Sequence, residues 1–365
     1  MCIAQAKRIA SQAVIRFADV ETASRNVAGV PAAARAARAL ALAGIERCWL
    51  VCGEGWQPDA RLRGEVLRLA GEMPVHFAAK SADAPVCGTG EAIWLSGEAI
   101  VAQLPARLSL SGLAGDTAWR ADDSGPAHSE AAFESAAQRI VAATGKPGDG
   151  IVSRTLNRPV SQAISRLALR WSGIRPGHAT WLTALLAAAM MACLLGGGES
   201  GLIAGALLFQ AASIIDGVDG EIARATFRAT DLGAKLDSLV DAATNIGFIA
   251  GVVINLWIAG SRDTALAGAM GLALMAAGLF LIGRQAAKSS APFTFNAVKD
   301  HFRAGGSRLM QWLTWLTMRD FIAFAAVLFV VSGFTESGVL AFATVAAGWF
   351  AVVLVVMGVS SRRTA

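Results

Sequence analysis

Four aspartates stand at fixed spacing near the middle of the chain, in the pattern D-x2-D-G-x2-A-R-x8-G-x3-D-x3-D. They are Asp216, Asp219, Asp237 and Asp241. Members of a pair are three or four residues apart, so on a helix each pair shares one face. Mg²⁺ and Mn²⁺ prefer carboxylate oxygens, and two ions about 3.5–4 Å apart can bridge a diphosphate. The pattern therefore predicts a two-ion site, for Mg²⁺ or Mn²⁺, that handles a pyrophosphate.

Small residues accompany the aspartates at fixed offsets. Gly220, Ala223 and Gly233 leave the helix surfaces bare, so that a nucleotide or another helix can approach the backbone. Arg224 follows Gly220 by one turn, where its charge can neutralise phosphate. An ion-pair network or an ion-transport site is the alternative, but neither accounts for the small residues.

The composition divides the chain into a soluble-type part and a membrane part. Hydrophobic residues make up 55% and charged residues 16%, whereas soluble domains carry about 25% charged residues. The apolar excess begins near residue 177. We therefore expect a soluble domain over residues 1–145, a linker over 146–176 and a membrane domain over 177–360. The five scattered cysteines, an odd number, indicate reduced thiols.

Six apolar segments are long enough to span a bilayer of about 30 Å. They are residues 178–196, 201–222, 236–258, 264–283, 315–333 and 338–358. Basic residues concentrate in the loops after the second and fourth segments and in the tail, while the other loops hold only Arg262. The positive-inside rule therefore predicts a multi-pass protein of the cell (inner) membrane with both termini and the aspartates in the cytoplasm. The start of the chain lacks the apolar core of a signal peptide. The pI near 9.2 is explained by these loops, without nucleic acid.

Residues 153–171 precede the first segment and have the pattern of an amphipathic helix. Their apolar residues fall mostly on one side and four arginines lie elsewhere. This pattern favours a helix lying in the membrane interface, against the alternative of a linker helix packed on the soluble domain.

The aspartate pattern resembles the CDP-alcohol phosphotransferase family at every fixed position, over roughly residues 150–360. The resemblance implies six transmembrane helices, a homodimer, and attack of an acceptor hydroxyl on the β-phosphorus of a CDP-alcohol with release of CMP. It also implies that Asp216, Asp219 and Asp237 bind metal, and that Asp241 lines the metal site and is the general base. The family often has T-P-N-x-x-T before the first span, where residues 175–180 here read R-P-G-H-A-T.

Two substrates would be needed, and the residues indicate classes for each. Residues 317–324, TMRDFIAF, resemble a segment of relatives of archaeal di-inositol-phosphate phosphate synthases, whose acceptor is an inositol phosphate. Arg319 is therefore expected to bind the acceptor, because a charged side chain within the membrane is costly and usually has a function. The first candidate donor is CDP-diacylglycerol, and the second is a CDP-linked polar alcohol.

Residues 1–145 alternate between strand and helix patterns, which predicts an α/β domain with a parallel sheet. We expect strands at 14–18, 48–52, 74–78 and 92–96, and helices at 31–43, 58–71 and 129–143. Residues 27–51 resemble the sugar-phosphate nucleotidyltransferase fold, as in the N-terminal part of the di-inositol-phosphate enzymes.

The phosphate-binding parts of that fold are missing. No glycine precedes Gly29 in the loop after the first strand, Val30 replaces the lysine of G-K-P, and Glu98 replaces a metal-binding aspartate. We expect an inactive domain, and the alternative is a bifunctional enzyme with an active cytidylyltransferase domain.

Two further functions remain open at this point. An ion-coupled transporter with an acidic membrane site would show internal repeats and interrupted helices, and no repeat is visible. A scaffold protein would account for residues 1–145 but leaves the aspartates without a role.

Overall fold

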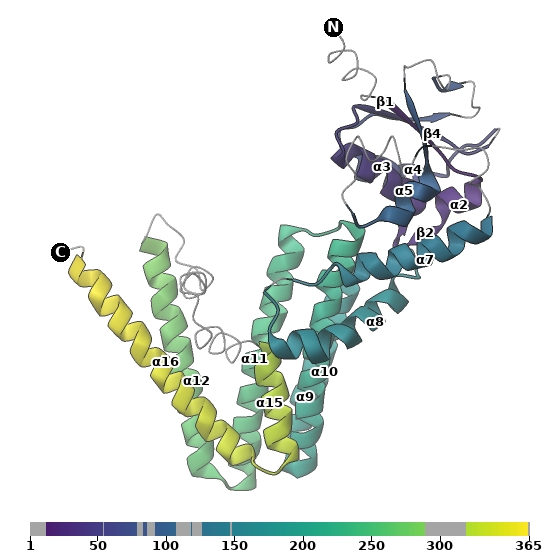
Figure 1. Cartoon of the computed structure of the whole chain (residues 1–365). Helices are drawn as coiled ribbons and strands as arrows, with labels where there is room; N and C mark the ends of the chain where they lie inside the picture. Colours follow the sequence, from purple (N-terminus) through teal and green to yellow (C-terminus); the bar gives the residue numbers. More distant parts are fainter. Residues whose placement is uncertain are drawn as a thin grey trace. The chain divides into compact units, whose positions relative to one another are not determined.

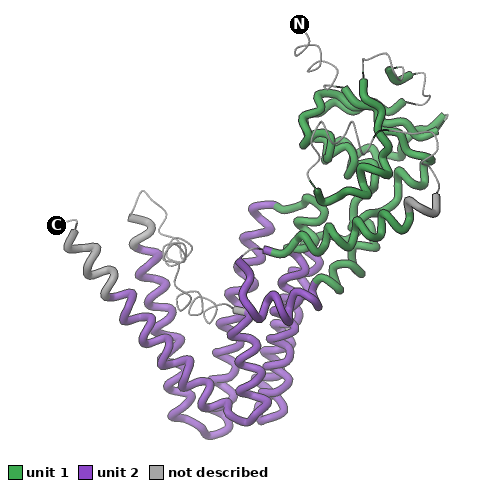
Figure 2. Tube along the Cα trace, viewed as in Figure 1, with its two compact units in different colours: residues 1–145, 162–176, 220–229 green, residues 146–161, 177–219, 230–365 purple. Residues whose placement is uncertain are grey.

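The computed structural model describes residues 12–53, 55–78, 83–85, 92–106, 118, 126–146, 148–288 and 319–363. The chain forms two compact units (Figure 2). The first comprises residues 1–145, 162–176 and 220–229, and the second comprises residues 146–161, 177–219 and 230–365. Two short segments from later in the chain thus belong to the same unit as the N-terminal domain.

A parallel sheet forms the centre of the first unit (Figure 1). Its strands are β1 (Gln12–Arg16), β4 (Arg47–Val51), β5 (Val75–Ala78) and β6 (Ile93–Ser96), in the order β5-β4-β1-β6. All three pairings are parallel. Ala13, Val14 and Ile15 are completely buried, as expected of a strand covered on both faces. The predicted α/β class is confirmed, and each strand lies within two residues of its predicted position.

Helices cover the sheet and pack on one another. They are α2 (Val20–Ser24), α3 (Ala32–Leu42), α4 (Ala60–Ala70), α5 (Gly97–Gln103) and α7 (Pro126–Ala142). Helix α3 contacts α4 and α5, and α5 contacts α7. Side chains cap the starts of three helices. Asp19 accepts from the Thr22 N–H at 2.7 Å, Asp59 from the Leu62 N–H at 2.6 Å and Ser96 from the Ala99 N–H at 3.2 Å. A small antiparallel hairpin, β2 (Asn26–Val27) and β3 (Val30–Pro31), precedes α3.

The described cysteines are free thiols. Cys48 and Cys52 are completely buried, and burial raises the pKa of the Cys48 thiol to about 12. Both are therefore protonated core residues, as the reduced-thiol interpretation expects. Cys2 and Cys87 lie outside the described residues.

Long apolar helices make up most of the second unit. They are α9 (Pro176–Leu195), α10 (Gly198–Thr226), α11 (Asp231–Ala259), α12 (Arg262–Lys288) and α16 (Thr335–Arg363). In the described part of the chain, these five are long and apolar enough to cross a membrane. The remaining predicted span, 315–333, corresponds to the shorter helix α15 (Arg319–Val331), and residues 315–318 lie outside the described residues. Six full spans therefore stay a prediction.

Close packing joins α9, α10 and α11. Phe209 and Phe248 stack with ring centroids 4.2 Å apart. Leu194 of α9 is completely buried and fills the space beside Gly251, where an added Cβ would lie 2.6 Å from its Cδ1. The buried Asn255 side chain donates to the Leu194 carbonyl at 2.8 Å. Contacts of this kind let helices associate without a hydrophobic driving force.

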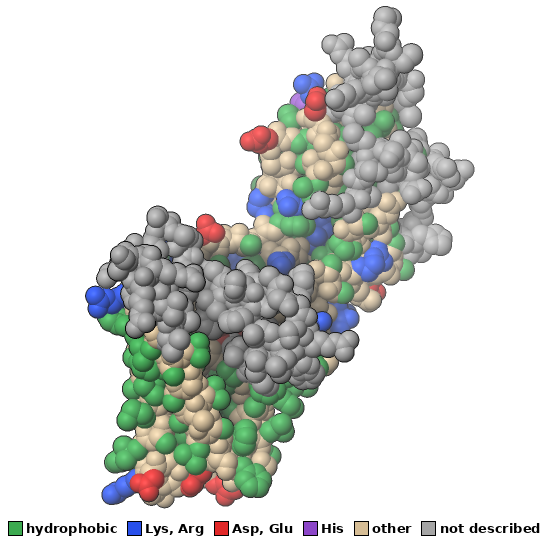
Figure 3. Space-filling model, turned by 60° about the vertical axis from the view of Figure 1, so that its left-hand side comes forward, with side chains coloured by type: hydrophobic (Ala, Val, Ile, Leu, Met, Phe, Trp, Pro, Cys, Tyr) green, Lys and Arg blue, Asp and Glu red, His purple; other side chains and the backbone are tan. Residues whose placement is uncertain are grey.

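Apolar side chains cover the outside of these helices (Figure 3). Trp181, Leu185 and Leu239 are 74%, 65% and 65% exposed. So large an apolar surface on five long helices is stable in lipid rather than in water, and it supports a multi-pass membrane protein.

The predicted amphipathic segment is helical, with its polar side turned inward. A π-helical turn, η2 (Ser153–Asn157), leads into α8 (Arg158–Ala168). Every fourth residue is buried: Ser153, Asn157, Ser161 and Ser165. The exposed residues include Leu156, Val160 and Leu167. The segment therefore buries hydroxyl and amide groups against the protein and presents apolar side chains outward.

Candidate functional site

The four predicted aspartates lie on two consecutive helices. Asp216 and Asp219 are in the last three turns of α10, and Asp237 and Asp241 are in the first three turns of α11. A short connection joins the helices, and Thr230 caps α11 by accepting from the Gly233 N–H at 3.1 Å. The prediction that Gly233 leaves room for a nucleotide or another helix stays a prediction. An added Cβ there would lie 3.0 Å from the Thr230 hydroxyl.

The fold brings the aspartate side chains together. The Asp237 carboxyl group lies within hydrogen-bonding distance of the carboxyl groups of Asp216 and Asp219. It is also close enough to Asp241 for the two negative charges to repel each other. Asp219 is 6% exposed. Like charges this close, bordering apolar helices, are costly unless cations or protons neutralise them.

The donor set fits hard divalent cations, because it consists of carboxylate oxygens alone. Among the described residues, however, no group of three or more His, Cys, Asp or Glu side chains meets the geometry of a metal site. Rotation about side-chain bonds can bring the oxygens of these neighbouring carboxylates to a shared ion. Asp216, Asp219 and Asp237 would hold such ions.

Two further side chains orient these carboxylates. Thr180 of α9 donates its hydroxyl to Asp219 Oδ2 at 2.9 Å. It is the last residue of the R-P-G-H-A-T segment, so the threonine shared with the family pattern is the signal that could have identified it. Asn245, one turn beyond Asp241, donates to Asp241 Oδ1 at 3.2 Å.

The small residues of the motif have different neighbours. At Gly217 an added Cβ would lie 3.4 Å from the Ser161 hydroxyl, so this bare position admits helix α8. At Gly220 it would lie 2.9 Å from Nη1 of Arg224, whose guanidinium covers that surface. Ala223 is half-buried, and its carbonyl accepts from the Arg228 N–H at 2.9 Å.

A polar cluster lies one turn before Asp216. Ser213 donates to Asp320 Oδ1 at 3.0 Å, and Asn157 donates to the same oxygen at 3.1 Å. Gln210 in turn donates to Asn157 Oδ1 at 2.8 Å. These bonds tie α10, η2 and the start of α15 together.

Asp320 follows Arg319 in the TMRDFIAF segment, and sequence reasoning did not identify the other members of the polar cluster. Helix α15 begins at Arg319, but the Arg319 side chain lies outside the described residues. The predicted contact of Arg319 with an acceptor therefore stays a prediction.

Comparison with known proteins gives one family. Residues 174–357 match the family described as CDP-alcohol phosphatidyltransferase. A protein named bifunctional IPC transferase and DIPP synthase, from Aquifex aeolicus, is 39% identical over 109 residues, which are 30% of this chain and 24% of that protein. Proteins of the same name from Thermococcus kodakarensis and Archaeoglobus fulgidus are 40% and 36% identical over 103 and 111 residues, covering 28% and 30% of this chain. These matches span less than a quarter of each relative's length: 24%, 22% and 21%.

We expect the aspartate cluster to bind Mn²⁺ through the carboxylates, with Thr180 in a supporting role. In detergent-solubilised protein, Thr180→Val should weaken Mn²⁺ binding by about tenfold, as loss of an outer partner typically does. Asp219→Asn should weaken it further, because it removes a charged ligand. Electron paramagnetic resonance of free Mn²⁺ measures both effects.

The matched control for this experiment is Asp231→Asn. Asp231 is an exposed aspartate in the first turn of α11, and its replacement should leave Mn²⁺ affinity unchanged. Equal affinities for the Asp219→Asn and Asp231→Asn variants would show that the cluster is not the ion site.

Proposed function

Because this chain belongs to the CDP-alcohol phosphatidyltransferase family, we propose that it moves a phospho-alcohol group from a CDP-alcohol to an acceptor hydroxyl at the membrane surface and releases CMP. The observation that carries the proposal is the convergence of Asp216, Asp219 and Asp237, with Asp241 in electrostatic range, at adjoining ends of two apolar helices.

Divalent ions complete the site in this proposal. Mg²⁺ or Mn²⁺, two ions together, would be held by Asp216, Asp219 and Asp237, and would supply the positive charge that a pyrophosphate requires. The protein's part is to keep the carboxylates in place, and Thr180 does so for Asp219. Arg224 is a candidate for contact with donor phosphate, because its guanidinium lies over Gly220 within the motif.

Asp241 is the proposed general base. Asn245 orients the Asp241 carboxylate through a hydrogen bond to Oδ1, and a carboxylate in this position can accept the proton of the acceptor hydroxyl. As that proton leaves, the hydroxyl oxygen forms a bond to the β-phosphorus of the donor. The bond from this phosphorus to the oxygen shared with the α-phosphate breaks, and CMP departs with the electron pair.

The substrates follow from resemblance and from the surroundings of the motif. CDP-diacylglycerol is the first candidate donor, since the motif helices are apolar and exposed to lipid. An inositol phosphate is the first candidate acceptor, supported by the relatives named DIPP synthase and by the likeness of residues 317–324. A homodimer is expected from the family resemblance.

Helix α8 is proposed to lie in the membrane interface. The exposed Leu156 of η2 and the exposed Val160 and Leu167 of α8 suit the boundary between headgroups and acyl chains. The loop charges support a location of both termini and the motif in the cytoplasm, at the inner membrane of the cell. Cysteines introduced at Glu199 and Glu336 should then react with an impermeant thiol reagent from outside, and one at Lys235 should not. The reverse pattern would contradict this orientation.

The N-terminal domain is proposed to lack nucleotidyltransferase activity. Val30 is completely buried in the hairpin and cannot meet a phosphate. The Glu98 carboxylate accepts from the Ala18 N–H at 2.7 Å. This backbone N–H of the loop after β1 is therefore already bonded to a carboxylate of the protein itself. Phe17 fills the space at Gly97, where an added Cβ would lie 2.4 Å from its ring. Pyrophosphate release from CTP and a phosphorylated alcohol would contradict this proposal.

The first functional prediction concerns CMP release. Purified protein with Mg²⁺ or Mn²⁺ should release CMP from at least one CDP-alcohol when a hydroxyl acceptor is present, and the product should carry the donor's phosphate. Asp219→Asn should abolish release, because the ion site loses a buried ligand, while Asp231→Asn should retain it. A panel of CDP-diacylglycerol and CDP-linked polar alcohols, each with and without inositol phosphate, identifies the pair.

The second functional prediction separates the base from the metal ligands. Asp241→Asn should lower turnover by about 10²–10⁴-fold, the usual cost of losing a base, with Mn²⁺ affinity and donor binding largely retained. Asp216→Asn should weaken metal binding as well as turnover. Equal losses of metal affinity in the two variants would mean that Asp241 is a fourth ligand.

A further inference from the structure

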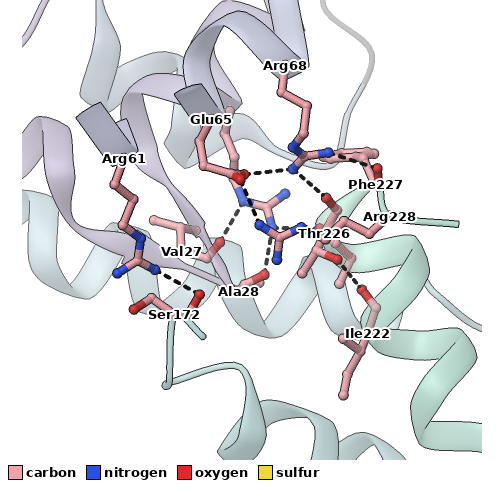
Figure 4. A network of polar contacts seen from close by, with 12 residues as sticks. Val27, Ala28, Arg61, Glu65, Arg68, Ser172, Ile222, Thr226, Phe227 and Arg228 are labelled. Atoms are coloured by element: carbon pink, nitrogen blue, oxygen red, sulfur yellow. Dashed lines mark hydrogen bonds and ion pairs between the residues drawn. The ribbon is translucent and has the colours of Figure 1, made fainter. Parts of the chain in front are cut away.

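The cytoplasmic end of α10 is capped by side chains of the N-terminal domain. The helix ends at Thr226, and the carbonyls of a last turn have no partners within the helix. Arg35 of α3 donates to the Ala225 carbonyl at 2.8 Å. Arg68 of α4 donates to the Thr226 and Phe227 carbonyls, both at 3.0 Å (Figure 4). Two cations therefore meet the negative end of the helix dipole.

Arg35 is a buried side chain that bonds to both the β2–β3 hairpin and α10. It is 2% exposed, and it also donates to the Val27 carbonyl at 2.6 Å and the Ala28 carbonyl at 2.9 Å. Burial, with a smaller effect of Arg38, lowers the pKa of Arg35 to about 9, so the guanidinium is still charged at neutral pH. Its bonds to backbone carbonyls join the β2–β3 hairpin to α10.

Glu65 orients the Arg68 guanidinium. Its carboxylate accepts from Arg68 and from Arg228, each at 2.7 Å (Figure 4). Burial acts to raise the pKa of Glu65, but hydrogen bonds and charge from the two arginines outweigh it and hold that pKa below its ordinary value. Glu65 is therefore ionised at neutral pH and links α4 to the chain beyond α10.

The turn after α10 is held in a costly conformation. Phe227 has φ 56°, a left-handed value that is rare for a bulky residue and persists only when its surroundings impose it. The Arg38 guanidinium lies 4.0 Å from the centre of the Phe227 ring, and Arg68 holds the Phe227 carbonyl. The N-terminal domain supplies both contacts.

The hairpin tip reaches the ends of two helices. Gly29 has φ +85°, and an added Cβ would lie 2.6 Å from Leu169 and 2.8 Å from Thr226. Asn26 donates to the carbonyls of Leu169 and Arg170, just past the end of α8, at 2.9 and 3.0 Å. The same short hairpin thus contacts the C-terminal ends of α8 and α10.

The arginine of the motif is also held by this unit. Arg224 donates through Nε to the Thr144 carbonyl at 2.8 Å, directly after α7. Thr144 is itself buried and donates its hydroxyl to the Val141 carbonyl at 2.6 Å. The direction of the Arg224 guanidinium therefore depends on the position of α7.

We propose that the N-terminal domain is a positioning element for the transferase site, with Arg35 and Arg68 as positioning residues that hold the cytoplasmic end of α10 and, with it, Arg224. The effect on turnover rests on the proposed function, whereas the effect on the helix end does not. The domain thereby has a role that needs none of the phosphate-binding residues it lacks.

The test compares variants of the full chain in detergent by amide hydrogen exchange of residues 220–229 and by the kinetics of CMP release. Arg68→Ala removes two charge-assisted hydrogen bonds, so exchange in this segment should become about tenfold faster or more. The specificity constant kcat/KM should fall by a similar factor, and KM for the donor should rise because Arg224 is less well placed. Arg68→Lys should have an effect on both readouts that is intermediate between those of the unsubstituted chain and Arg68→Ala, because an ammonium lacks the forked donor geometry that bonds two carbonyls.

Arg63→Ala is the matched control, because Arg63 is an exposed arginine of α4 that packs over the Phe77 ring. It should change neither readout. Protection of strands β1 and β4 shows whether each variant keeps its fold. If Arg68→Ala does not keep it, Glu65→Gln carries the comparison, because it weakens the alignment of Arg68 and leaves the guanidinium in place.

Unchanged exchange in residues 220–229 would overturn the proposal. Faster exchange with unchanged kcat/KM and KM would also overturn it, since the contact would then be structural alone. If the unsubstituted chain releases no CMP from any donor, the proposed function has failed, and the exchange measurement still decides whether Arg68 holds the helix end.

Discussion

Repulsion among the aspartates is the constraint on which the rest of the structure depends. Asp216, Asp219 and Asp237 are within reach of one another at the ends of apolar helices, where unneutralised charge is expensive. Such an arrangement persists only if the helices are held together by other means. Stacking of Phe209 on Phe248 and burial of Leu194 beside Gly251 provide that packing, and hydroxyl and amide donors such as Thr180 and Asn245 satisfy individual carboxylate oxygens.

Helix α10 has three parts along its length, each with different contacts. Its apolar part packs with α9 and α11, its next turns carry two motif aspartates, and its final turn is bound by arginines of the N-terminal domain. The grouping of residues 220–229 with the first unit reflects these contacts. Without these contacts the carbonyls of the helix end would lack their side-chain partners.

Helix α8 shows how a polar face can be the buried one. Ser161 faces the bare surface of Gly217, and Ser165 donates to the completely buried Glu221 carboxylate at 2.6 Å. Since these hydroxyls and amides are satisfied by the protein, the apolar residues are left to face outward. In water this arrangement would be unfavourable, whereas at a bilayer surface it is stabilising.

The sequence alone determined what is local: the aspartate spacing, the apolar segments, and the four strands of the parallel sheet with helices α3, α4 and α7, because each is indicated by periodicity and residue type. It did not predict α2, α5 or the β2–β3 hairpin. The partners of the motif came only from the tertiary structure. The family pattern marks Thr180, but nothing in the spacing shows that it bonds Asp219, or that Asn157 and Ser213 share Asp320 Oδ1. Arg35 lies 190 residues from the carbonyl that it caps. Such contacts depend on which helix faces meet, and that is decided by packing over the whole chain.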